Sequence, residues 1–240
     1  MNHTYFDIPG WFSFHDVYDR AVAFLGKDGA HFVEVGCYEG RSAAYMGVNI
    51  VNSHKKIRFD CVDSWEKEIK QYDVDGRLTI AAGSPQIKGR DVFDRFQKNM
   101  SVFDGLADIR TFKGQSTVIA ANYADNSLDF VFLDASHAAQ DVYDDIKAWR
   151  PKLKPLGVMA GDDISYPGVG MALQKNGMGT ELNPLVQSDG GYKSWIHVPI
   201  HLQKMWITRN PEATDFANQE GKAAAAADTV REHLGIGAHA

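Results

Sequence analysis

The eleven residues from Phe32 to Ser42, FVEVGCYEGRS, constrain the fold of this chain more than any other stretch. An apolar, largely β-branched run enters a turn with glycines four positions apart, and a helix-like sequence follows from Ser42. Gly36 allows a sharp bend, and Gly40 allows another group to approach where a Cβ atom would collide. The helix start offers free N–H groups and a positive dipole end. This order of strand, turn and helix predicts the ligand-binding corner of an α/β sheet.

Length and composition limit the classes of protein that fit. A chain of 240 residues suits one large α/β domain, and a net charge of −6 argues against a dedicated nucleic-acid binder. Cys37 and Cys61 form neither a disulfide framework nor a zinc motif, so we expect two reduced, buried thiols. The N-terminus lacks a signal-peptide pattern, and nowhere do 18 apolar residues run together. We therefore expect a soluble, cytoplasmic protein with no membrane partner.

Strand-like and helix-like segments alternate along most of the chain. This alternation predicts an α/β, Rossmann-like fold with a seven-stranded, mostly parallel sheet and helices on both faces. Glycine-rich and proline-rich turns separate the segments, including a turn over 154–157. The strands are expected at 31–35, 57–62, 107–112, 128–133, 158–160, 195–198 and 203–208.

The predicted organisation is a single domain with three additions. Residues 1–30, with a helix over 16–25, form an N-terminal helical cap, and residues 31–210 form the α/β domain. Residues 66–90 lack a steady period and are long for a connection, so we predict a partly helical, lid-like insertion there. Residues 211–240 are predicted to be a C-terminal helical tail because of their alanine-rich composition.

Polar or glycine residues fall at the carboxyl ends of five predicted strands. They are Gly36, Asp63, Gly114, Asp134 and Asp162. Ligands of open α/β sheets bind outside the carboxyl ends of the strands, so five such residues predict one shared site. Asp63 is placed to accept hydrogen bonds from the ribose of an adenosyl cofactor, although a solvated strand-end aspartate remains the alternative.

Three carboxylates are expected to meet on this edge. If the strands that end at Asp134 and at Asp162–Asp163 are neighbours, they lie about 5 Å apart, and their charges repel unless a cation neutralises them. Oxygen ligands favour Mg²⁺, Mn²⁺ or Ca²⁺ over zinc, whereas the alternative is that Asp162 or Asp163 caps the following turn. His137, three residues after Asp134, is a candidate general base for a metal-bound hydroxyl, or else a structural histidine.

The order of these residues resembles a known family. The chain looks like the class I S-adenosylmethionine-dependent methyltransferases in six places. They are 34–42 (EVGCYEGRS), Asp63, 114–116 (GQS), 128–134 (LDFVFLD), His137 and Asp162–Asp163. More narrowly, they are similar to the metal-dependent, catechol O-methyltransferase-like branch, which includes bacterial sugar O-methyltransferases of the macrolide type. The resemblance covers roughly residues 31–165.

The resemblance implies a role for most of the candidate site residues. The methionine part of the cofactor would be held by Glu34, Gly36, Tyr38 and Ser42, the ribose by Asp63, and the adenine near Gly114, Gln115 and Ser116. We also count Gly40, Trp65 and Asp134 as cofactor-binding, although Trp65 could equally pack in the core. Asp134, Asp162 and Asp163 fall on the metal ligands, and His137 on the catalytic base. Catechol-type enzymes carry Asn at the position of Asp163 and Lys at that of His137, so the acceptor is expected to be a sugar or another hydroxyl.

The sequence therefore predicts an S-adenosylmethionine- and Mg²⁺-dependent O-methyltransferase acting on a hydroxyl of a small molecule, such as a sugar, glycoside or phenolic natural product. Two alternatives stay open: a hydroxylase of the cephalosporin-hydroxylase type, which would need O₂ and an electron donor, and a non-catalytic cofactor-binding protein. A nicotinamide dehydrogenase is disfavoured because the turn lacks G-x-G-x-x-G spacing. No nucleic-acid partner is expected, and a homo-oligomer is left open.

Overall fold

The structure is a computed structural model in which residues 1–3, 5–65, 70–72, 78–80, 91–179, 185–187 and 194–197 are described. Side chains are not described for 70–72, 78–80 and 185–187. The predicted strand over 203–208 and the predicted helical tail over 211–240 lie outside the described residues.

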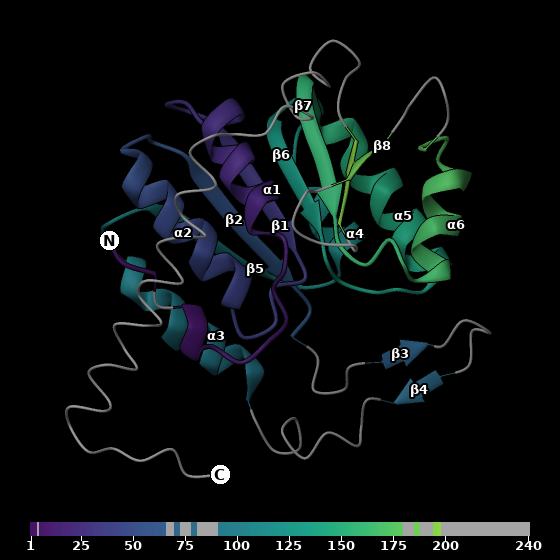
Figure 1. The fold of residues 1–240 in the computed structure, drawn as a ribbon, viewed down its shortest axis with the longest axis horizontal. Coiled ribbons are helices and arrows are strands. Elements are labelled where there is room, and N and C mark those ends of the chain that lie inside the picture. The colour runs from purple at the N-terminus through teal and green to yellow at the C-terminus, as the bar shows by residue number, and fades with distance from the viewer. Residues whose placement is uncertain are drawn as a thin grey trace. The chain divides into compact units, whose positions relative to one another are not determined.

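Within the described part of the chain, a mostly parallel sheet of seven strands forms the centre of the fold (Figure 1); its strand over 185–187 was not predicted. The first five strands in the spatial order run parallel, and the last two are antiparallel to their neighbours. The order is β5 (Asp108–Lys113), β2 (Arg58–Asp63), β1 (His31–Val35), β6 (Leu128–Leu133), β7 (Leu153–Gly161), β9 (Trp195–His197) and β8 (Leu185–Gln187). This arrangement confirms the α/β, Rossmann-like fold with a mostly parallel sheet.

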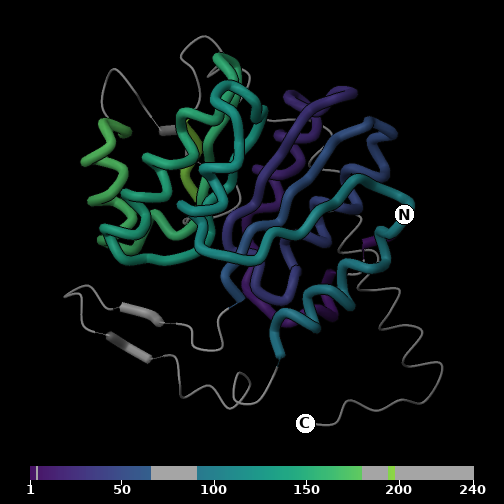
Figure 2. The backbone as a smooth tube through the Cα atoms, turned by 180° about the vertical axis from the view of Figure 1, so that it is seen from behind, coloured from purple at the N-terminus to yellow at the C-terminus, as the bar shows by residue number. Residues whose placement is uncertain are grey.

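Helices cover both faces of the sheet because successive strand residues point to opposite sides (Figures 1 and 2). Phe32 of β1 packs in one hydrophobic cluster, whereas its neighbour Val33 packs in the other. The first face is covered by α1 (His15–Arg20), α2 (Arg41–Ser53) and α3 (Val92–Met100), and the second by α4 (Ser116–Ala120), α5 (Ala139–Trp149) and α6 (Pro167–Lys175). Shorter helical turns are η1 (Tyr5–Asp7), η2 (Ala21–Leu25), η3 (Ser101–Phe103) and η4 (Arg150–Lys152).

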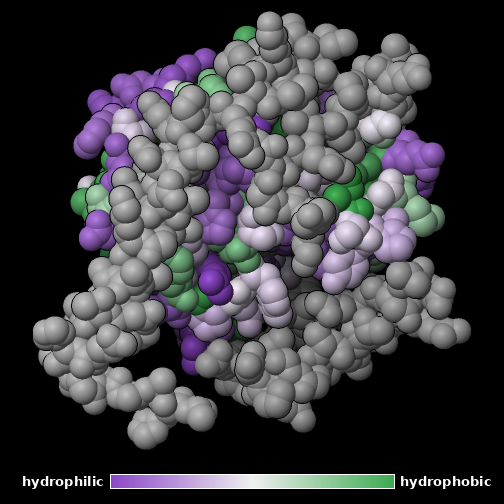
Figure 3. Space-filling view, viewed as in Figure 1, coloured by the Kyte–Doolittle hydropathy of each residue, from purple (hydrophilic) through white to green (hydrophobic). Residues whose placement is uncertain are grey.

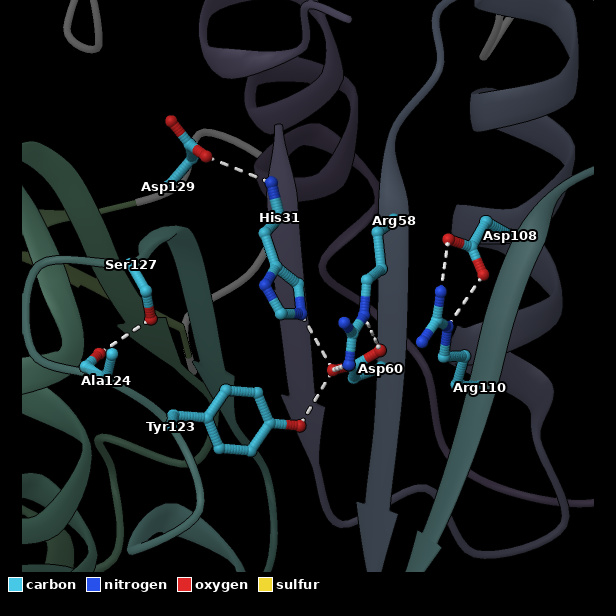
Figure 4. A network of polar contacts seen from close by, with 9 residues as sticks. All are labelled: His31, Arg58, Asp60, Asp108, Arg110, Tyr123, Ala124, Ser127 and Asp129. Atoms are coloured by element: carbon cyan, nitrogen blue, oxygen red, sulfur yellow. Dashed lines mark hydrogen bonds and ion pairs between the residues drawn. The ribbon is translucent and has the colours of Figure 1, made fainter. Parts of the chain in front are cut away.

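A buried polar network lies toward the amino ends of β1 and β2 (Figure 4). The Asp60 carboxylate, which is fully buried, accepts hydrogen bonds from Arg58 Nε (2.8 Å) and Tyr123 Oη (2.8 Å), and it contacts His31 Nε2 at 2.7 Å. Burial alone would raise the pKa of Asp60, but these three partners outweigh burial and lower it. The network joins β1 and β2 to the segment after α4, and it lies nearer to the amino ends of these strands than to their carboxyl ends.

Two parts of the chain differ from the sequence predictions. Residues 154–157, predicted as a turn, belong to β7, and the ladder between β6 and β7 shifts register between Leu128 and Phe130. Four residues of β7, including Pro155, lie between the pairs Leu128–Leu153 and Phe130–Val158, against one residue of β6, so the ladder is interrupted where Pro155 has no N–H group to pair. In the insertion over 66–90, the described residues form two short antiparallel strands that were not predicted from the sequence, β3 (Lys70–Tyr72) and β4 (Leu78–Ile80), and the prediction of helix in this insertion falls on residues outside the described ones. A lid role for this insertion stays a prediction.

The described surface carries no large apolar face in the view of Figure 3, where hydrophobic residues form only small, separate areas. Among the residues that the structure describes, no helix combines the length and the hydropathy needed to cross a bilayer.

Candidate functional site

The predicted strand-end residues lie together along one edge of the sheet. Four of the five continue the hydrogen-bonded ladder by one step, because their backbone N–H groups donate to the last residues of the neighbouring strand. The bonds are Gly36 N to Val62 O (2.8 Å), Asp134 N to Val35 O (2.8 Å), Asp162 N to Leu133 O (3.1 Å) and Gly114 N to Asp63 O (2.9 Å). The fifth residue, Asp63, ends β2 and accepts the bond from Gly114, so all five lie at the carboxyl ends of neighbouring strands, and one shared ligand site stays a prediction.

The glycine loop after β1 is shaped by two left-handed glycines. Gly36 has φ +92°, and a Cβ atom at this position would overlap the backbone carbonyl of Asp134, so the loops after β1 and β6 touch. Gly40 also has φ +92° and precedes α2. A Cβ atom there would lie 3.1 Å from the Phe96 ring, so the close approach that we expected at Gly40 is made by a side chain of α3.

Asp63 holds this loop in place. Its Oδ2 accepts the backbone N–H groups of Cys37 (2.8 Å) and Tyr38 (2.9 Å), and its Oδ1 accepts that of Trp65 (2.8 Å). A carboxylate has about four acceptor positions, so room for about one further donor, such as a ribose hydroxyl, remains. The predicted ribose contact fits the residue, but with fewer free positions than the sequence suggested.

Trp65 is a packing residue in this structure. Its side chain is buried, its ring packs against Phe93 and Phe96, and its Nε1 donates to the carbonyl of Tyr38 (2.8 Å). Of the two readings that the sequence left open for Trp65, this geometry favours packing in the core, and an adenine contact stays a prediction.

Glu34 is a buried acid with one oxygen left over. Its Oε1 accepts a hydrogen bond from the Ser42 hydroxyl, while no hydrogen-bond partner of Oε2 is found among the described residues. Burial raises the pKa of Glu34 to about 8 against the opposing effects of the Ser42 and Tyr18 hydroxyls, and the buried Tyr18 hydroxyl acts on Glu34 without a hydrogen bond of good geometry to Oε2. A buried acceptor without a partner is costly unless a donor arrives, and the cofactor's ammonium group is such a donor. The residue set therefore fits the methionine end of S-adenosylmethionine.

Gly114, Gln115 and Ser116, the three residues after β5, differ in exposure and in their contacts. Gln115 is exposed, and Gly114 has φ +158° before α4 begins. The Ser116 hydroxyl accepts a hydrogen bond from Trp149 Nε1 (2.8 Å), and its hydrogen bond to Asp145 opposes the effect of burial, which raises the pKa of Asp145 to about 6. Ser116 thus attaches the start of α4 to α5, and a cofactor contact is a prediction for all three residues.

Two carboxylates and an imidazole converge where β6 and β7 end. One ligand atom each from Asp134, His137 and Asp163 lies within 4.8 Å of the others, and His137 Nε2 is 2.6 Å from Asp163 Oδ2. Burial raises the pKa of Asp134 well above its usual range, and the charges of Asp162 and Asp163 raise it further. A divalent cation would relieve this repulsion, and the carboxylate oxygens of Asp134 and Asp163 suit a hard ion such as Mg²⁺.

Asp162, the third predicted metal ligand, has a different neighbour. Its Oδ1 accepts a hydrogen bond from the Ser194 hydroxyl (2.8 Å), which comes from the residue before β9. The cluster therefore consists of Asp134, Asp163 and His137, with Asp162 beside it on the same edge, so metal ligation by Asp162 stays a prediction.

Sequence reasoning missed several residues around this cluster. Ser194 and Trp195 reach the site from the antiparallel strand β9, and no sequence signal marks them because they lie more than 30 residues from Asp162. Trp195, Asp145 and Val169 line a small pocket together with Asp134 and His137. Tyr166 was not missed, since the sequence had suggested it either as an aromatic pocket residue or as a packing residue; in the structure it stacks on the His137 ring.

The comparison with protein families decides the class. A family model described as a methyltransferase domain matches residues 33–164, which is more than half of the chain. The chain belongs to this methyltransferase family. The matched range begins within β1 and ends after Asp163, so it contains the glycine loop, Asp63 and the acidic cluster. S-adenosylmethionine is accordingly the methyl donor of this methyltransferase.

Solved structures support the fold of the methyltransferase. The O-methyltransferase NovP is similar at a TM-score of 0.55 with 15% identity, over 77% of this chain and 76% of that one. The calicheamicin methyltransferase CalS11 is similar at 0.58 with 16% identity over the same shares, and its apo structure at 0.51 with 15% identity. Curated proteins were also compared, and none matches the sequence.

Proposed function

We propose that this methyltransferase is a Mg²⁺-dependent O-methyltransferase that acts on a hydroxyl of a small molecule, with a sugar or glycoside preferred over a phenol. One observation carries the proposal: Asp134, His137 and Asp163 converge directly beside the glycine loop, since the backbone of Asp134 touches Gly36. A metal–base cluster next to the methyl donor is what the activation of a hydroxyl requires.

The donor side of the reaction depends on the loop and its supports. Glu34 would release its proton when the cofactor binds and would offer Oε2 to the methionine ammonium, and Asp63 would offer its remaining acceptor position to the ribose. The backbone of residues 36–38 is held by Asp63, which accepts the N–H groups of Cys37 and Tyr38, and by the contact between Gly36 and Asp134. Pre-organisation of this kind brings donor and acceptor into line without a further entropic cost.

The acceptor side depends on the acidic cluster. Asp134, Asp163 and Asp162 would hold Mg²⁺, with Mn²⁺ or Ca²⁺ as alternatives, and the bound ion would hold and acidify the acceptor hydroxyl. His137 is the proposed base. With its Nε2–H donating to Asp163, its Nδ1 carries the lone pair that takes the proton, and Asp163 stabilises the imidazolium that results.

The preference for a sugar acceptor has two supports. The apo CalS11 structure is described as a TDP-rhamnose 3′-O-methyltransferase, and the His137 and Asp163 pair departs from the catechol pattern. An exposed aromatic side chain, Trp11, also lies beside the glycine loop, with its ring centroid 6.2 Å from that of Tyr38. An aromatic face of this kind stacks on sugar rings as well as on phenols.

Two measurements test the proposal. Calorimetric titration with S-adenosylmethionine, with and without Mg²⁺, measures donor binding. Methyl transfer from labelled donor to a panel of nucleotide sugars, glycosides and phenols is then measured with Mg²⁺ or with EDTA, for the wild type and for Asp134→Asn. We expect donor binding in all cases and transfer only for the wild type with metal.

The same experiment can refute each part separately. Transfer that is equally fast with EDTA and in Asp134→Asn would remove the metal mechanism and leave the family assignment in place. A product that carries a new hydroxyl instead of a methyl group, formed only with O₂ and an electron donor, would favour the hydroxylase alternative.

A further inference from the structure

We propose that residues 163–168, which form the turn leading into α6, fix the orientation of His137, with Tyr166 as a positioning residue. We call this segment the bracket. The proposal rests on the proposed function for its catalytic consequence, because it assumes that His137 is the base. Its structural part concerns the contacts of His137 with the side chains of Tyr166 and Asp163 and with Gly168, and it can be tested without any acceptor.

The imidazole of His137 is held from two directions. The Tyr166 ring stacks on its face, with 4.3 Å between ring centroids and 27° between planes. In the plane of the ring, Nε2 lies 2.6 Å from Asp163 Oδ2. A contact on the face and a contact on the edge restrict different rotations of a side chain, so together they leave Nδ1 in one direction.

One tight turn carries both partners of His137. The Tyr166 N–H donates to the Asp163 carbonyl (2.8 Å), which closes a turn with Asp163 in the left-handed region at φ +61°. Tyr166 then precedes Pro167, the first residue of α6, where the fixed φ of proline suits a helix start. The carboxylate and the phenol ring are therefore set relative to each other by local backbone geometry.

Gly168 has no Cβ atom and therefore lets the start of α6 contact the backbone of His137 closely. A Cβ atom at Gly168 would overlap the His137 carbonyl oxygen and lie 3.0 Å from the Ala139 nitrogen. Any larger residue would push the start of α6 away from the segment it contacts. Gly170, two residues further along the same helix, has open space around it and provides a matched control.

The bracket matters because a general base works only at hydrogen-bonding distance from the proton that it accepts. A displacement of about 1 Å in a reacting group can lower a rate about 100-fold. Tyr166 is 43% exposed and hence contributes little to the core, so its substitution should leave the fold intact. Its hydroxyl is not needed for stacking, so phenylalanine should replace it.

Four variants test the bracket: Tyr166→Leu, Tyr166→Phe, Gly168→Ala and Gly170→Ala. Proton NMR of the His137 ring reports stacking directly, because a ring face shifts the C–H resonances of its neighbour upfield. We expect this upfield shift in the wild type, Tyr166→Phe and Gly170→Ala, and its loss in Tyr166→Leu. Gly168→Ala should move the same resonances part of the way.

Kinetics with an acceptor identified by the panel then measures positioning. Tyr166→Leu and Gly168→Ala should lower kcat about 10- to 100-fold, with KM for the acceptor and Kd for S-adenosylmethionine nearly unchanged. Tyr166→Phe and Gly170→Ala should match the wild type. A purely structural role would instead lower donor affinity and stability together with kcat.

Either of two results would overturn the inference. His137 resonances that are the same in Tyr166→Leu and the wild type would show that the rings do not stack. Unchanged kcat in Tyr166→Leu with a lost upfield shift would show that the stack exists but does not position the base. If no methyl transfer is found for any acceptor, the NMR result still decides the bracket while the proposed function fails separately.

Discussion

Acidic residues at the site differ because their surroundings differ. Glu34 is buried with one oxygen unpartnered among the described residues, whereas Asp63 accepts three backbone N–H groups. Asp134 faces two further carboxylates. Each environment fits one ligand group: an ammonium for Glu34, a single hydroxyl for Asp63 and a divalent cation for Asp134. Side chains of one chemical type can thus serve three purposes within a single edge of a sheet.

Glu34 should make the protein less stable at higher pH. Its pKa in the folded state is about 8, raised from 4.5, so between these values the folded protein keeps a proton that the unfolded chain has released. The free energy of unfolding should therefore fall by about 1.4 kcal/mol per pH unit in this window from this group alone. Urea unfolding of the wild type and of Glu34→Gln, from about pH 5 to about pH 8, measures the slope.

Glu34→Gln should flatten this slope because glutamine does not titrate. Ser42→Ala is the control, since it removes the hydrogen bond to Glu34 but keeps the acid and hence the slope. An identical slope in the wild type and in Glu34→Gln would contradict the buried, protonated state of Glu34.

Substitution of His137 separates catalysis from binding. His137→Ala should lower turnover about 100- to 10,000-fold, the range for loss of a general base. The affinity for S-adenosylmethionine should stay nearly the same, because the proposed donor contacts lie on the loop after β1. Calorimetry and steady-state kinetics measure the two quantities, and equal losses in both would identify His137 as a structural residue.

At the scale of elements, the two ends of the strands have different tasks. Glycines, aspartates and one histidine at the carboxyl ends form the candidate site, whereas the network around Asp60 joins elements toward the amino ends (Figure 4). A buried carboxylate is stable only when its partners are in place, so this network contributes to stability through contacts rather than through chemistry.

Tyr123→Phe should weaken this network without affecting the site. The substitution removes a hydrogen bond to a buried carboxylate, and the free energy of unfolding should fall by about 1.5–3 kcal/mol. The lowered pKa of Asp60 stabilises the fold above its usual value of 3.8, and this stability is lost as the pH falls through the folded pKa. The variant should therefore also unfold at a higher pH during acid titration.

Circular dichroism during urea and acid titration measures both effects. Tyr143→Phe is a matched control, because the Tyr143 ring lies under the Lys175 ammonium at 3.9 Å and this contact does not need the hydroxyl. A loss of S-adenosylmethionine affinity in Tyr123→Phe would show that the two ends of the sheet are coupled.

At the scale of the whole molecule, binding should stabilise the fold in two separable steps. A ligand at 100 times its Kd adds about 2.7 kcal/mol to the free energy of unfolding. S-adenosylmethionine should raise the melting temperature alone, and Mg²⁺ should raise it further. Thermal melts with each ligand and with EDTA measure both steps.

Asp163→Asn should keep the stabilisation by the donor and reduce the stabilisation by Mg²⁺, because an amide oxygen can still bind the ion, as the catechol-type pattern implies, but carries no charge. Asparagine tolerates the left-handed backbone of Asp163, so the turn should survive while the charge is removed. A Mg²⁺ effect of wild-type size in this variant would show that the charge of Asp163 does not contribute to binding of the ion.

The sequence predicted the parts of this protein that depend on neighbours in the chain. The alternation of strand-like and helix-like segments identified the parallel sheet, and glycines and aspartates after those strands marked the edge where the site is expected. That β6 and β7 are neighbours was only a condition of the metal prediction, and the structure shows that it is met. These features are local, so a pattern of a few residues contains the information.

Contacts between distant residues were decided by the tertiary structure alone. Ser116 bonds Trp149, 33 residues away, and Ser194 bonds Asp162, 32 residues away, so neither partner could be read from spacing. Trp65 went into the core because Phe93 and Phe96 of α3 lie beside it. The sequence by itself determined which edge of the sheet holds the chemistry, because strand ends are encoded locally. The packing of helices and of β9 against that edge decided which side chains hold the residues of the candidate site in place.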